Sequence, residues 1–116
     1  KMIAEFDGLP FAGQKVNGKL TVSENIADAG GLSCALAAAK EEKDFDAQRF
    51  FINWARIWRM KATDQYMQLL LSIDVHSPNK LRANVQAQNQ DEFYQAFNVQ
   101  AGDGMYLAPE KRVNIW

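Results

Sequence analysis

The stretch that decides the fold is TVSENIADAGGLSCALAAAK, residues 21–40. Leucine and alanine recur within it at the spacing of one helix face, and no proline interrupts it. Thr21 and Glu24 stand three residues apart, the pattern of a capping box, which predicts that a helix begins near Thr21. Gly30 and Gly31 each cost this helix about 1 kcal/mol relative to alanine. We therefore expect a neighbouring segment to approach the helix closely at the two glycines.

The rest of the chain predicts a mainly α fold with a loop-rich last third. The predicted helices span residues 20–43, 46–60, 63–74 and 89–98, between an irregular start over 1–19 and an extended tail over 99–116. The Asn17-Gly18 pair favours a tight turn, so a short hairpin or loop is expected near the start. Pro78 disfavours a helical Ser77, which predicts that His76 lies where a helix ends and a loop begins.

Two further expectations concern the core. The second predicted helix has two adjoining apolar stripes, and so wide an apolar face indicates burial on two sides. The stripes consist of Phe50, Trp54 and Ile57, and of Phe51, Ala55 and Trp58. Cys34, the single cysteine, is expected to be a small core residue. It has no partner for an internal disulfide, which fits a reducing compartment.

Composition limits the classes of function. The chain has 116 residues, of which 47% are hydrophobic and 23% charged, and its formal net charge is −1. These values indicate one globular domain or part of one, and they argue against a basic nucleic-acid binder. No apolar run is long enough to span a bilayer, and no block of lysine and arginine favours an anionic membrane surface. The first residue is Lys1, so we expect a piece of a longer protein, with any targeting signal upstream.

One group of candidate catalytic residues surrounds the only histidine. His76 follows Asp74 by two residues and precedes Arg82 by six. An aspartate can fix the tautomer of an imidazole, and an arginine can stabilise a developing oxyanion. A solitary histidine is more often structural than catalytic, so the spacing alone leaves both interpretations open.

A second group is a pair of carboxylates on the first predicted helix. Glu24 and Asp28 are four residues apart and therefore share one helix face. They fit a metal site in which the glutamate is a ligand and the aspartate orients a ligating histidine. The residues alone favour a helix cap and a solvated acid near the helix start over this metal site. No H-E-x-x-H, G-x-S-x-G or C-x-x-C motif and no glycine-rich phosphate loop decides between the two.

Several ordered motifs resemble one family. VNGKLTVSENIADAGGL, residues 16–32, is similar to the E-N-I-A-D-x-G-G-L signature of the neprilysin-type zinc endopeptidases, which include the bacterial oligopeptidases O. The resemblance continues in order through FFINWARIW (50–58), DVHSPNKLR (74–82), EFYQAF (92–97) and PEKRVNIW (109–116). Val113 stands where secreted animal members have a cysteine, which favours the disulfide-free bacterial type and a cytoplasmic location.

The resemblance implies a set of roles. The position of Glu24 is the third zinc ligand, and that of Asp28 holds a zinc-binding histidine. The positions of His76 and Arg82 stabilise the tetrahedral intermediate and contact the peptide substrate. Asp74 is expected to orient the imidazole on chemical grounds, apart from the resemblance. The family's H-E-x-x-H helix, which carries the other two ligands and the general base, is absent here.

The chain therefore resembles the C-terminal part of a zinc endopeptidase for oligopeptides. Its expected partners are a peptide substrate and the upstream part of the same polypeptide. By itself it is expected neither to hold Zn²⁺ nor to hydrolyse peptides, because a catalytic zinc site needs three protein ligands. The apolar surface at Gly30 and Gly31 is expected to be exposed or covered by a second copy of the chain. The alternative is a non-catalytic helical interaction domain that keeps the motifs as scaffold.

Overall fold

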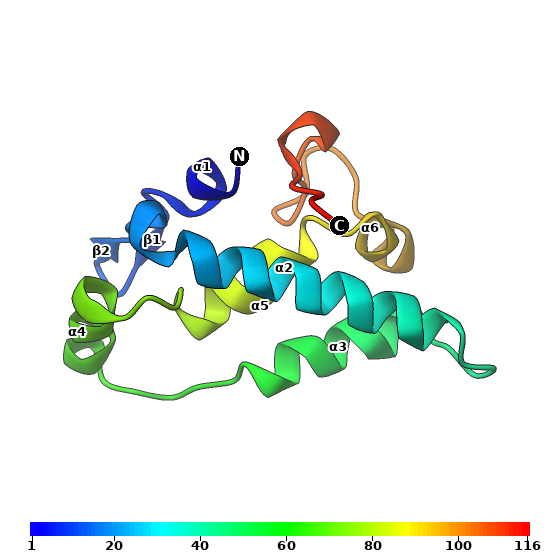
Figure 1. The fold of residues 1–116 in the computed structure, drawn as a ribbon, viewed down its shortest axis with the longest axis horizontal. Helices are drawn as coiled ribbons and strands as arrows, with labels where there is room; N and C mark the ends of the chain where they lie inside the picture. The colour runs from blue at the N-terminus through cyan, green and yellow to red at the C-terminus, as the bar shows by residue number, and fades with distance from the viewer.

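The structure, a computed structural model, describes residues 1–116 and confirms a mainly α fold. Figure 1 shows a long central helix, α2, with the other elements packed around it. The elements in chain order are α1 (Met2–Phe6), β1 (Pro10–Phe11), β2 (Gln14–Lys15), α2 (Gly18–Lys40), α3 (Ala47–Ile57), α4 (Asp64–Ile73), α5 (Asn79–Ala87), α6 (Asp91–Phe97) and a short 3-10 helix, η1 (Pro109–Lys111). No helix combines the length and the hydropathy that crossing a bilayer requires.

Helix α2 begins one turn before the predicted capping box. Asn17 is the N-cap, and its side chain accepts hydrogen bonds from the backbone N–H groups of Lys19 and Leu20. The predicted start near Thr21 is therefore wrong, and Thr21 is buried inside the helix. The Asn17-Gly18 pair serves as a helix start and not as a tight turn. The predicted hairpin turns instead at Ala12 and Gly13, which both have positive φ.

Two helices lie where none was predicted. α5 occupies residues 79–87, a stretch expected to be loop, because Pro78 ends the preceding loop and stands as the N-cap of a new helix. α1 occupies residues 2–6 of the segment predicted to be irregular. α6 begins at Asp91 and not at Asn89, because the side chain of Asn89 bonds elsewhere.

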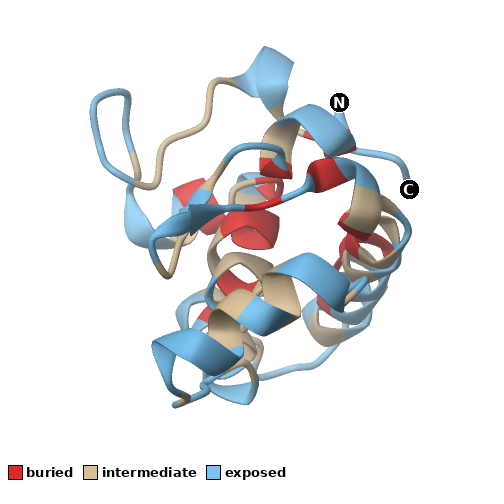
Figure 2. Ribbon diagram, turned by 90° about the vertical axis from the view of Figure 1, so that its left-hand side faces the viewer, coloured by how far each residue is buried: buried red, intermediate tan, exposed pale blue.

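The core consists of two clusters that α2 connects. The first lies between α1, α2, α5 and the end of the chain and contains Met2, Phe6, Val16, Ala29, Val85 and Val113. The second lies between α2, α3 and α6 and contains Leu36, Phe51, Ala87, Phe93 and Tyr94. Figure 2 shows the buried positions, in red, where the elements of the fold face one another. Since both clusters use α2, the burial of this one helix fixes much of the fold.

Three expectations about burial need correction. Of the two stripes on α3 only Phe51 is buried, and Ile57 is 67% exposed because no other element covers the end of this helix. Cys34 is exposed and not a core residue. Close approach occurs at Gly30 only, where a Cβ atom would lie 2.6 Å from the indole of Trp116, whereas a Cβ atom on Gly31 would meet nothing within 4 Å.

Candidate functional site

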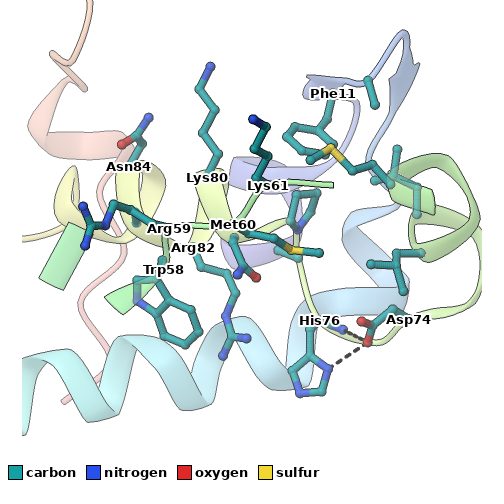
Figure 3. A pocket seen from close by; sticks show the side chains of 18 of the residues that line it. Phe11, Trp58, Arg59, Met60, Lys61, Asp74, His76, Lys80, Arg82 and Asn84 are labelled. Carbon is teal, nitrogen blue, oxygen red and sulfur yellow. Dashed lines mark hydrogen bonds and ion pairs between the residues drawn. The ribbon is translucent and has the colours of Figure 1, made fainter. Parts of the chain in front are cut away.

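The site begins with the two carboxylates on one face of α2. Glu24 and Asp28 are one helical turn apart, as their spacing predicts. The connection between α4 and α5 brings His76 against this face, and its Nε2 lies 3.2 Å from Oε2 of Glu24. Its Nδ1 lies 2.8 Å from Oδ1 of Asp74, the contact drawn in Figure 3. The imidazole is therefore held between two carboxylates from different parts of the chain.

Asp74 shapes the loop as well as the ring. Its carboxylate accepts a hydrogen bond from the backbone N–H of His76 at 2.9 Å. This backbone hydrogen bond, followed by the side-chain contact with the same residue, lowers the pKa of Asp74 below its ordinary value. The ionised carboxylate thus fixes both the backbone and the ring of His76.

Arg82, on α5, is clamped by Asp28. Its Nε and one terminal nitrogen, Nη2, donate to the two oxygens of Asp28 at 2.7 and 2.8 Å. Its guanidinium also lies 3.8 Å from the centroid of the Trp58 ring. A bidentate pair stacked on an aromatic ring holds a guanidinium in one orientation. The other terminal nitrogen, Nη1, makes no hydrogen bond within the chain and keeps its donors free.

A buried polar network lies beneath the site. The fully buried Asn25 donates from Nδ2 to the hydroxyl of Thr21 at 3.0 Å, and its Oδ1 accepts from the Ser77 hydroxyl at 2.7 Å. The backbone carbonyl of Asn25 accepts from Nε2 of Gln86 at 2.8 Å. The network ties α2 to the residue after His76 and to α5.

Apolar spacing in the sequence does not predict this network. Thr21, Asn25, Ser77 and Gln86 are all buried, although none is apolar. The signal that could have found part of it is the i, i+4 placement of Thr21 and Asn25 on α2, in a helix whose other buried positions are apolar or glycine.

A cavity of about 1190 Å³ opens beside His76 and Arg82. It lies between the β1–β2 hairpin, the segment that follows α3, α4 and the start of α5. Its apolar lining includes Phe11, Trp58, Met67 and Leu71. Figure 3 shows His76 and Arg82 pointing toward α2 at one side of this cavity. A ligand in the cavity would therefore adjoin the donors of both side chains.

The donor set fits zinc only in part. The Glu24 side chain is 39% exposed, so its carboxylate is accessible to a metal ion. No group of three or more His, Cys, Asp or Glu residues in the chain could hold a metal ion. Because a catalytic zinc site has three protein ligands, Glu24 can be one ligand and the others would have to come from outside these residues.

The structure brings all five candidate residues together. Glu24 and Asp28 come from α2, Asp74 and His76 from the loop after α4, and Arg82 from α5. They form two contiguous groups, one around the imidazole and one around the guanidinium. Their catalytic roles stay predictions, since the distances show proximity only.

The chain is similar to proteins of known sequence. The family model "Peptidase family M13" matches residues 1–113. The chain is 57% identical to "Neutral endopeptidase" of Lactococcus lactis subsp. lactis over 116 residues, which is 100% of this chain and 18% of that protein. The chain thus spans less than a fifth of the length of this curated relative.

The chain is also similar to solved structures. The crystal structure of PEPO from Lactobacillus rhamnosis HN001 matches with a TM-score of 0.92 and 51% identity, over 99% of this chain and 18% of that one. The Mycobacterium tuberculosis zinc metalloprotease Zmp1, solved in complex with an inhibitor, matches with a TM-score of 0.86 and 34% identity, over 99% and 20%. With the family model matching nearly every residue, the resemblance to the neprilysin-type endopeptidases is confirmed, and the chain belongs to peptidase family M13.

Proposed function

We propose that the chain forms part of the active site of a zinc-dependent endopeptidase that cleaves oligopeptides. Glu24 is one metal ligand, and His76 and Arg82 are donors to the oxygen of the scissile carbonyl. The observation that carries the proposal is the contact between His76 and Glu24, which joins a helix to a distant loop at the mouth of a cavity. The printed names of the relatives, a neutral endopeptidase and a zinc metalloprotease, support the reaction and the metal.

The metal would be shared with the upstream part of the same polypeptide. Glu24 offers one carboxylate, and the H-E-x-x-H helix expected upstream supplies the other two ligands and the general base. Zinc, when bound, supplies a Lewis acid that polarises the peptide carbonyl. The partial exposure of the Glu24 carboxylate supports this division.

The chain's own residues then act as fixed donors. Asp28 and the ring of Trp58 hold Arg82 so that Nη1 is left for the substrate. Asp74 holds Nδ1 of His76, so Nε2, the ring atom beside Glu24, is the donor proposed for the substrate. Donors that are already oriented toward a developing negative charge need little reorganisation during the reaction, which lowers its barrier. Asp28 and Asp74 are therefore positioning residues in this proposal.

The test uses the full-length protein and two variants. Glu24→Gln removes the charged ligand, so zinc content by elemental analysis and peptide cleavage should both fall to background. His76→Ala should keep its zinc and lower kcat about 10²–10³-fold, the effect of losing one such donor. Glu42→Gln, an exposed glutamate in the turn after α2, is the control and should keep both zinc and rate.

Retention of zinc and rate in both variants would contradict the proposal. The alternative function, a non-catalytic helical interaction domain, gains some support from the exposed apolar residues of α4, Tyr66, Leu69 and Ile73. It predicts a full-length protein that cleaves no peptide with zinc supplied and that a chelator leaves unaffected. Chelator-sensitive cleavage by the wild-type protein would exclude it.

A further inference from the structure

The cavity beside His76 carries an excess of positive charge. Its lining contains four cationic side chains and two carboxylates, although the whole chain has a net charge of −1. Two of these charges are already paired, since Arg82 bonds to Asp28 and Asp74 bonds to His76. The remaining carboxylate belongs to Asp64, in the first turn of α4, and it forms no ion pair.

The three remaining cations are Arg59, Lys61 and Lys80. None of them lies within ion-pair distance of a carboxylate. Arg59 donates only to the backbone carbonyl of Arg56, at 3.3 Å. Figure 3 shows Lys61 and Lys80 extending in the same direction, away from the side of the cavity where His76 and Arg82 lie. All three are exposed, so they form a basic rim on a cavity that is otherwise largely apolar.

The apolar lining and the basic rim together favour one class of ligand. The volume, about 1190 Å³, exceeds the usual range of about 300–1,000 Å³ for small-molecule sites and suits an extended segment of peptide. The apolar lining suits side chains without charge. The basic rim attracts a negative group over about 8 Å at physiological ionic strength and repels a positive one.

We infer that the cavity prefers a peptide with a carboxylate, which Lys61, Lys80 and Arg59 contact at the rim while the peptide adjoins His76 and Arg82. The inference rests on the proposed peptidase function, because it treats the cavity as the place where the substrate binds. The carboxylate belongs either to an acidic side chain or to the C-terminus of the peptide. The two sources share the same chemistry and are separated by experiment.

The first experiment measures cleavage by the full-length enzyme. Matched peptides carry Glu or Gln at each position flanking the cleaved bond, and each is made with a free or an amidated C-terminus. We expect kcat/KM to be about two- to tenfold higher for one carboxylate-bearing member of a pair, the range for one to two exposed ion pairs. The pair that shows the difference identifies the source of the carboxylate. The preference should decrease at high salt because exposed charges are screened.

The variants test whether the basic rim causes the preference. In Lys61→Gln/Lys80→Gln the ratio of kcat/KM between acidic and neutral peptides should fall toward one. Lys43→Gln, an exposed lysine in the turn after α2, is the matched control and should keep the wild-type ratio. A double variant that keeps the full preference, or a wild-type enzyme with none, overturns the inference.

A binding measurement separates this inference from the proposed function. Fluorescence anisotropy with the same labelled peptide pairs is carried out in the presence of a chelator, so that the readout does not depend on cleavage. The acidic peptide should bind about two- to tenfold more tightly than the neutral one to the wild type, and this difference should be lost in the double variant. Cleavage without a charge preference contradicts only the inference. If the wild-type enzyme cleaves neither peptide, the proposed function is wrong. If the two peptides also bind equally tightly, the inference is wrong as well.

Discussion

Helices α2 and α4 both border the candidate site, but they are held in different ways. α2 has seven buried residues and belongs to both core clusters, whereas α4 has none. The apolar residues Leu69 and Ile73 of α4 lie largely at the surface, Ile73 with 64% of its area exposed. The difference shows that the candidate site residues depend on the frame made by α2 and α5. α4 forms a wall of the cavity and contributes only a partly buried residue, Leu71, to the packing of that frame.

Matched leucine substitutions give the strongest test of this difference. Leu32→Ala on α2 removes a fully buried side chain and should lower the free energy of unfolding by about 2–5 kcal/mol. Leu69→Ala on α4 should change it by no more than about 0.5 kcal/mol, because half of the side chain is already exposed. Urea denaturation of the chain measures both. Equal losses would mean that α4 is anchored as firmly as α2.

The buried amide of Asn25 should be the next most sensitive position. Asn25→Ala removes the partners of the Ser77 and Thr21 hydroxyls and leaves a small cavity, so the free energy of unfolding should fall by about 2–3 kcal/mol. Asn53→Ala on the exposed side of α3 is the control and should cost no more than about 0.5 kcal/mol. If the two variants were equally stable, the polar network would not contribute to holding α2 against the loop of His76.

Glu5, on helix α1, is a partly buried carboxyl group that destabilises the folded protein once it ionises. It accepts a hydrogen bond from Asn89 at 3.1 Å, and its other oxygen is buried without a partner. Burial raises the pKa of Glu5 from 4.5 to about 7, so the folded protein keeps this proton to a higher pH than the unfolded chain does. The resulting loss of stability therefore grows as the pH rises from about 4.5 through about 7.

Glu5→Gln should remove that dependence. The free energy of unfolding of the variant, relative to the wild type, should increase by about 1–2 kcal/mol between pH 5 and pH 8. This value is smaller than the full pKa shift would give, because the carboxyl group is partly exposed to solvent. Urea denaturation at the two pH values measures the increase, with the exposed Glu41→Gln as control. An advantage that stays constant with pH would show that Glu5 titrates normally in the folded protein.

The smallest effects are expected at the two glycines of α2. Gly31→Ala should stabilise the chain by about 0.5–1 kcal/mol, because alanine favours the helix and nothing lies within 4 Å of the added methyl group. Gly30→Ala should gain less or lose stability, because its methyl group would displace the indole of Trp116. Thermal unfolding of both variants measures the difference. Equal gains at both positions would show that the contact with Trp116 is not maintained in solution.

The sequence predicts this molecule well where apolar spacing determines the structure. The periodicity of residues 21–40 indicates the helix that becomes α2, and the motif around His76 indicates a loop at a helix end, as observed. The family motifs contain five candidate residues that the structure brings together. Spacing along the chain does not predict this proximity, whereas motifs in the order of a known family do, because they indicate a shared fold.

The parts that could not be predicted involve polar burial and competing local signals. α5 escapes an apolar-periodicity search because one of its buried positions is Gln86, whose amide bonds to the backbone of α2. The start of α2 was misplaced because Asn17 and Thr21 are both acceptable N-caps, and only tertiary packing selects the first. Cys34 was placed in the core because residue type does not say which side of a helix lacks a neighbour.

Two hydrogen bonds, one on each side of α4 in the chain, have a consequence for engineering this region. The indole N–H of Trp54 bonds to the backbone of Ala83, and Ser77 bonds to Asn25, so residues 59–73 run between two fixed points. Loops of other lengths and sequences grafted between these points would reshape one wall of the cavity and leave the positions of Glu24 and His76 unaltered. If the proposed function holds, exchange of this segment is a route to altered peptide specificity with the candidate site residues left in place.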